Sequence, residues 1–185
     1  MAFFYFLKLG VLHVIPLGFD HILFIVSLFF LRSDLRSSAL QCSVFTVAHS
    51  LTLWLSATCA LPFNSTIVES AIAFSIFIVA LENVYQTKIS SWRLIIVFVF
   101  GLIHGMGFAA SLKEVNLPQA SFLAALFGFN CGVEIAQLSI IALLYFGIAS
   151  WASKYSWYQT FLVKNLSLLI AGIGLFWSIE RIISN

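Results

Sequence analysis

Long apolar runs, separated by short polar or proline-containing breaks, dominate this sequence. A membrane-spanning helix needs about 20 mostly apolar residues. Residues 3–15 are apolar but too few to span, and they include Lys8 and His13. We therefore expect a short N-terminal helix over 1–16 that is interfacial or re-entrant. Clear breaks follow at 61–64 and 116–118. The remaining runs predict about six transmembrane helices, at about 18–32, 36–60, 65–86, 92–113, 119–149 and 158–182.

Composition agrees with this pattern, because 62% of the residues are hydrophobic and only 9% are charged. Soluble domains carry about 25% charged residues. We therefore predict an all-α fold, a polytopic membrane helix bundle that forms a single transmembrane domain over 1–185. The net charge of +2 and the absence of basic runs argue against a nucleic-acid partner. The three cysteines lie in apolar segments without a C-x-x-C pair, as buried small hydrophobes do.

Lysines and arginines near the helix ends predict the orientation, because cytoplasmic loops carry an excess of them. With the N-terminus outside, six of these residues fall on the inner side and three on the outer side. The inner set is Arg32, Arg36, Lys88, Arg93, Lys154 and Lys164, and the outer set is Lys8, Lys113 and Arg181. We expect an integral protein of the bacterial inner membrane with both termini outside.

The stretch 13–21 places two imidazoles and a carboxylate at the start of the first long apolar run. Pro16 lacks a backbone donor and disfavours helix in the residue before it, so the helix should break there. Gly18 permits a close approach of backbone or ligand. The break should turn His13 back toward Asp20 and His21, at the outer side of the bundle.

Further polar residues lie near the middle of the predicted spans. His49 and His104 lie near mid-span in the second and fourth, and Glu134 in the fifth. Gly101 and Gly105 share the face of His104, where small residues permit close helix packing. Polar residues inside a membrane are costly and usually face the protein interior.

All four histidines of the chain thus lie where burial is expensive. Imidazole together with carboxylate suits zinc, nickel, cobalt or iron, and the missing thiolate pair argues against copper(I) or an iron–sulfur cluster. The expected metal ligands are His13, Asp20, His21, His49 and His104. Glu134 is expected as proton acceptor or occasional ligand. The residues expected to orient these groups are Thr46, Ser50, Asn130 and Gln137. A proton relay, or a polar network that only holds the helices together, is the alternative.

Five stretches carry a resemblance to a known family: 13–21, 45–53, 68–75, 101–109 and 128–137. The chain resembles the HupE/UreJ-type hydrogenase and urease accessory membrane proteins, and most closely the second branch of that family. This resemblance implies a role like that of nickel or cobalt permeases that serve nickel enzymes. It matches His13, Asp20 and His21 to the family's first motif and His104 to a later one. Gly107 and Phe108 stand where a second histidine or glutamate would complete the later motif.

Three functions follow from this reading. The first is a nickel/cobalt-type divalent metal permease or metal-delivery accessory protein. Six helices are few for a transporter, and assembly as a homo-oligomer would compensate. The alternative is an intramembrane zinc-dependent hydrolase acting on a lipid or membrane peptide, in which Glu134 or Asp20 is the catalytic general base. The third is a metal sensor or an assembly partner of another membrane protein.

Overall fold

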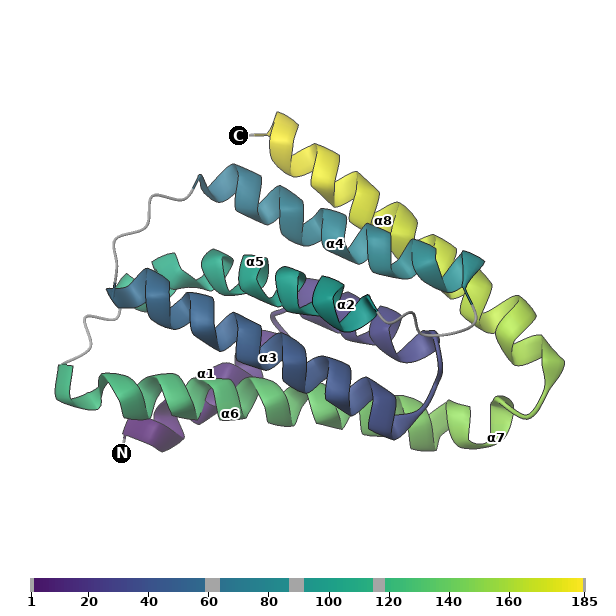
Figure 1. The fold of residues 1–185 in the computed structure, drawn as a ribbon, viewed down its shortest axis with the longest axis horizontal. Coiled ribbons are helices and arrows are strands. Elements are labelled where there is room, and N and C mark those ends of the chain that lie inside the picture. Colours follow the sequence, from purple (N-terminus) through teal and green to yellow (C-terminus); the bar gives the residue numbers. More distant parts are fainter. Residues whose placement is uncertain (1, 59–63, 87–91, 115–118, 185) are drawn as a thin grey trace.

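The computed structural model describes residues 2–58, 64–86, 92–114 and 119–184, and the elements in these ranges are helices (Figure 1). Cys59, Lys88 and the expected breaks at 61–63 and 116–118 lie outside the described residues, as do the side chains of 108–114. The elements are α1 (Ala2–Val14), α2 (Phe19–Phe30), α3 (Leu35–Thr58), α4 (Ser65–Tyr85), α5 (Arg93–Glu114), α6 (Gln119–Leu144), a π-helical turn η1 (Tyr145–Ala149), α7 (Ser150–Ala152), a second π-helical turn η2 (Tyr158–Val163) and α8 (Lys164–Ile183).

Three stretches of the described chain are long and apolar enough to cross a membrane. They are Ser65–Tyr85, Phe122–Ala152 and Tyr158–Ile183. The pair α1 and α2 passes the same test when the two helices are taken together as one bent span. The expected all-α membrane protein is therefore confirmed, with three or four candidate spans by length and composition.

A sharp bend separates α1 from α2. The two helix axes differ by 71°. Helix α1 ends at Val14 and α2 begins at Phe19, so the break falls on Pro16 and Gly18 as the sequence predicts. The Leu17 N–H still donates to the Leu12 carbonyl at 3.3 Å, which closes the last turn of α1. Figure 1 shows this break beside the middle of α3, inside the bundle rather than at its end.

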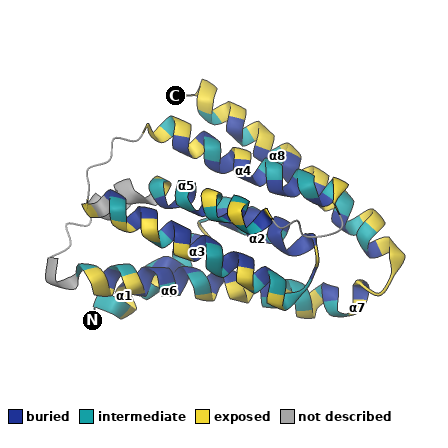
Figure 2. Cartoon of the chain, in the orientation of Figure 1, coloured by how far each residue is buried: buried dark blue, intermediate teal, exposed yellow. Residues whose placement is uncertain are grey.

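Helix α2 forms the centre of the bundle. Seven of its twelve residues are buried, all of them between His21 and Phe30, and Figure 2 colours much of the visible part of α2 as buried. The other long helices pack in pairs, α1 with α6, α3 with α5 and α4 with α8. Because lipid replaces water around such a bundle, its outer face stays apolar, and large side chains such as Phe127 and Phe176 are exposed there.

Figure 1 places the last turns of α3 and α5 and the first turns of α4 and α6 at one end of the bundle. Two basic residues that we counted as loop charges lie within helices and pair with carboxylates of other helices. Arg93 is 1% exposed and pairs with Glu82, and its buried guanidinium needs this carboxylate partner. Arg181 in α8 is partly exposed and pairs with Asp20.

Helices α3 and α5 approach closely because of two glycines. A Cβ added at Gly101 would lie 2.6 Å from the Phe45 carbonyl oxygen and 2.8 Å from the Ala48 Cβ. A Cβ at Gly105 would collide with the His49 carbonyl and the Thr52 hydroxyl. The predicted close contact of this glycine face is therefore confirmed, and it brings His49 and His104 to adjacent positions.

Candidate metal centre

The break between α1 and α2 brings two histidines into contact. The ring centroids of His13 and His21 are 4.7 Å apart, with their planes at 67°. Gly18 makes this possible, because a Cβ there would collide with the His13 carbonyl and lie 3.2 Å from His21 Nδ1. The predicted return of His13 toward His21 is present, and it lies beside the middle of α3. The reason is that α1 enters the bundle and packs along α6 before the chain turns.

His49 of α3 completes a group of three imidazoles. One ring nitrogen from each of His13, His21 and His49 lies within 4.8 Å of the other two. Nitrogens that share one ion at about 2.1 Å lie at most about 4.2 Å apart. Small rotations of these rings would therefore bring all three to a common ion. His49 is fully buried, and neither of its nitrogens makes a hydrogen bond to a described residue.

His104 lies beside this group with one nitrogen directed by the backbone. Its ring centroid is 5.3 Å from that of His21. Its Nδ1 lies 2.8 Å from the Phe100 carbonyl oxygen, which can only accept, so Nδ1 carries the proton. Its Nε2 is buried without a hydrogen-bond partner in the part of the chain that the structure describes. An imidazole held in this way offers Nε2 to a metal ion, as metal-binding histidines usually do.

Phenylalanines enclose the four imidazoles. The His49 ring lies nearly parallel to Phe45 and Phe129, at 27° and 19°, and His104 packs against Phe24 and Phe45 with centroids 5.3 and 4.9 Å apart. Sequence reasoning missed these aromatic neighbours, although Phe45 and His49 are separated by one helical turn. These apolar rings offer no strong hydrogen-bond partner to the imidazole nitrogens, so leaving the nitrogens without partners is costly.

Asp20 lies next to the imidazoles but binds a cation of the protein itself. The Arg181 guanidinium contacts both Asp20 oxygens, at 3.0 and 3.2 Å. A pocket of about 600 Å³ is lined by these two residues together with His13, His21 and His104. Sequence reasoning missed Arg181 here, because 161 residues separate it from Asp20.

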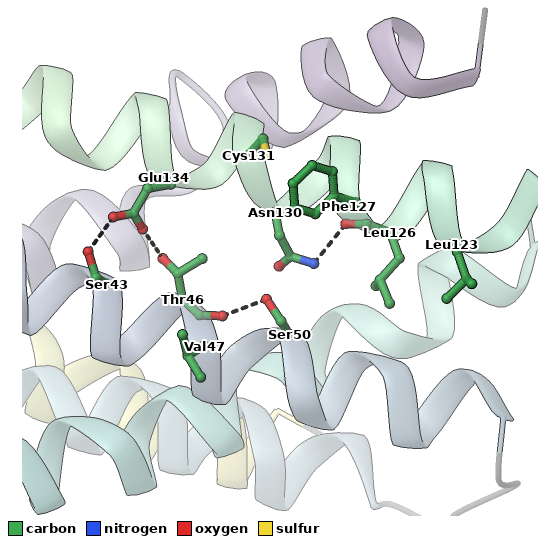
Figure 3. A pocket seen from close by; sticks show the side chains of 10 residues that line it. All are labelled: Ser43, Thr46, Val47, Ser50, Leu123, Leu126, Phe127, Asn130, Cys131 and Glu134. Atoms are coloured by element: carbon green, nitrogen blue, oxygen red, sulfur yellow. Dashed lines mark hydrogen bonds between the residues drawn. The ribbon is translucent and has the colours of Figure 1, made fainter.

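Glu134 lies apart from this cluster, in a second pocket of about 580 Å³ between α3 and α6 (Figure 3). Its two oxygens accept hydrogen bonds from the Ser43 hydroxyl at 2.6 Å and the Thr46 hydroxyl at 2.5 Å. Figure 3 shows the carboxylate directed toward these hydroxyls. It is not part of the group of residues that could share one ion with His13, His21 and His49.

The four residues expected to orient the ligands have other contacts in the structure. Thr46 also lies 3.1 Å from the Gln137 side-chain oxygen, and Ser50 donates to the Thr46 carbonyl in its own helix. Asn130 donates to the Leu126 carbonyl (Figure 3). Its side chain also lies beside that of His49, although the pair does not reach standard hydrogen-bond geometry. Asn130 is thus the member of this set that lies beside an imidazole.

Comparison with known proteins agrees with the motifs. The family profile described as "HupE / UreJ protein" matches residues 1–181, which is nearly the whole chain. No curated protein and no solved structure matches the sequence.

Proposed function

The chain belongs to the HupE/UreJ family, and on this premise we propose that it is a nickel/cobalt-type divalent metal permease or metal-delivery protein. In this proposal the imidazoles of His13, His21 and His49 bind the ion during its passage, and His104 is a fourth ligand. The surrounding bundle has six spans, with α3 and α5 crossing the bilayer beside the candidate spans. Assembly as a homo-oligomer would complete a transport path.

The observation that carries this proposal is the group of three imidazoles whose ligand atoms lie within 4.8 Å of one another in the apolar interior. A buried polar group without a partner costs about 1–3 kcal/mol. His49 and His104 together have three such ring nitrogens among the described residues. A bound divalent ion would satisfy nitrogens that the described residues leave without hydrogen bonds.

The donor set favours borderline metals as the cargo. Neutral imidazole suits nickel, cobalt and zinc, whereas soft ions prefer thiolates. Cys42 is buried but does not belong to the group that could share an ion with the histidines. The family resemblance makes nickel our first choice, with cobalt and zinc next.

The hydrolase alternative receives less support from this arrangement. It needs a carboxylate general base within hydrogen-bond reach of a metal-bound water. Glu134 accepts hydrogen bonds from Ser43 and Thr46 in a different pocket, and Asp20 is paired with Arg181. We therefore place transport or delivery before catalysis.

The test is metal content of the purified protein after incubation with nickel, cobalt or zinc, measured by elemental analysis. H21A, H49A and H104A should each lose more than 90% of the bound ion. E134Q is the matched control and should keep it, since Glu134 lies outside the group. Uptake of radioactive nickel into proteoliposomes then separates a permease from a sensor. Full metal occupancy in both H49A and H104A would overturn the metal site and favour the proton-relay or structural reading.

A further inference from the structure

Arg181 is held in a defined position by three helices. Its guanidinium contacts both oxygens of Asp20 in α2 and donates to the Glu69 carbonyl oxygen of α4 at 2.9 Å. Within α8 it lies over the Trp177 ring, 5.7 Å from the centroid. These contacts fix one positive charge at a single place in the bundle.

That place is the mouth of the candidate metal centre. The pocket that Arg181 and Asp20 line is also lined by His13, His21 and His104. Arg181 and Asp20 are 24% and 25% exposed, so the pair lies where the pocket opens, whereas His21 and His104 are buried behind it. A cation that reaches the imidazoles through this pocket passes the ion pair.

A fixed guanidinium at this position opposes the binding of a metal cation. A guanidinium keeps its charge across the physiological pH range, so a change of pH does not remove the repulsion. It also occupies both oxygens of Asp20, the carboxylate next to His21 in the sequence. As a brace between α2 and α8, a partly exposed ion pair contributes only about 0–1 kcal/mol. Stability alone therefore explains the arrangement poorly.

We propose that Arg181 is a specificity-determining residue that competes with the metal ion for Asp20. This inference rests on the proposed function. When a divalent ion enters the pocket, Asp20 exchanges the guanidinium for the ion, and Arg181 returns to Asp20 when the ion leaves. Coulomb energy is proportional to charge, so a dication gains about twice the energy of a monocation at the same distance from Asp20. Arg181 thereby excludes monovalent cations and promotes release of the bound metal.

The experiment measures nickel affinity by calorimetry in detergent for R181Q, D20N, the double variant D20N/R181Q, and R36Q. Arg36 is exposed at the start of α3, so R36Q removes the same charge from outside the pocket and should keep the wild-type affinity. R181Q should bind nickel about fivefold or more tightly, within the usual range of coupling between two binding events. This gain should vanish in D20N/R181Q compared with D20N, because Asp20 mediates it.

Selectivity gives a second readout that a purely structural role would not change. At constant ionic strength, replacing a bulky organic cation by potassium should weaken nickel binding to R181Q and leave the wild type unchanged. Wild-type affinity in R181Q would overturn the proposal, as would an equal gain with and without Asp20, which would indicate only long-range repulsion.

If R181Q does not fold, the exchange can be followed with Arg181 in place. Trp177 is one of five tryptophans, and converting the other four to phenylalanine isolates its fluorescence. Nickel should change this emission as the Arg181 guanidinium leaves the Trp177 ring. An unchanged emission at saturating nickel would refute the proposed exchange at Asp20. Absence of nickel binding to the wild type would refute the proposed function itself. Normal wild-type binding with no effect in the Arg181 experiments refutes this inference alone.

Discussion

Replacing His49 by phenylalanine separates a ligand role from a structural one. The imidazole lies nearly parallel to Phe45 and Phe129, so a phenyl ring is compatible with these neighbours. His49 has two buried nitrogens without hydrogen bonds to the described part of the chain. If His49 is a metal ligand, these nitrogens have no partner in the metal-free protein, and this lowers its free energy of unfolding. H49F should therefore abolish metal binding and stabilise the metal-free protein.

The size of the gain follows from the contacts. Each unsatisfied buried polar group costs about 1–3 kcal/mol, and a neutral imidazole has one donor and one acceptor. The larger phenyl ring overpacks the site, which lowers the free energy of unfolding by about 1–3 kcal/mol. With mid-range values, about 4 kcal/mol recovered and about 2 kcal/mol lost, the net gain in the free energy of unfolding is about 2 kcal/mol. For a protein of this length, each kcal/mol raises the melting temperature by about 2–4 °C.

The assay is thermal unfolding in detergent with a chelator present, together with metal content. H49A is the comparison, because it removes the same two nitrogens but leaves a cavity, so the metal-free H49A should melt below the metal-free H49F. A metal-free H49F that melts below the metal-free wild type would show that the nitrogens are stabilising partners in a polar network. Metal content equal to that of the wild type in H49F would show that His49 is not a ligand. Either result would refute the reasoning.

Three further predictions address packing, Glu134 and orientation. G105L should reduce folded yield at least several-fold in size-exclusion chromatography, because its side chain would collide with α3; G172L, where a Cβ meets nothing within 4 Å, is the matched control and should keep its yield. E134Q should keep metal content within about twofold, because Glu134 lies outside the group that could share an ion, whereas loss of a group that supports a ligand costs about 10–100-fold in affinity. It should lower the melting temperature, because the amide NH2 cannot accept the hydrogen bond that a hydroxyl of Ser43 or Thr46 donates to the carboxylate; an unchanged melting temperature would contradict these hydrogen bonds. Single cysteines at Arg36 and Lys154 in a cysteine-free background should be labelled only from the cytoplasmic side, and labelling from outside would reverse the predicted topology.

Much of this protein follows from local sequence. The apolar runs identify a membrane protein because only helices or closed barrels satisfy backbone hydrogen bonds in lipid. The break at Pro16 and Gly18 was predictable because proline lacks a donor and glycine lacks a Cβ. Helical periodicity placed Gly101, His104 and Gly105 on one face, and that face does pack against α3.

Other features depend on which helices become neighbours. Periodicity places a residue on a face of its helix but does not determine which helix that face meets. Glu134 was expected near the histidines, yet α6 turns it toward Ser43 and Thr46 in a separate pocket. The structure also decides that α1 enters the bundle, so His13 meets His21 beside the middle of α3.

The pairing of charges was the least predictable feature. Arg93 and Arg181 were counted as loop charges, because charge counting treats a basic residue near a helix end as solvated. The fold buries Arg93 against Glu82 and directs Arg181 to Asp20, 161 residues away in the chain. Local sequence determined that imidazoles and carboxylates lie inside the membrane domain. Only the packing of α2, α4 and α8 decided that Asp20 faces a guanidinium at the mouth of the histidine cluster, because long-range contacts arise from the arrangement of whole helices.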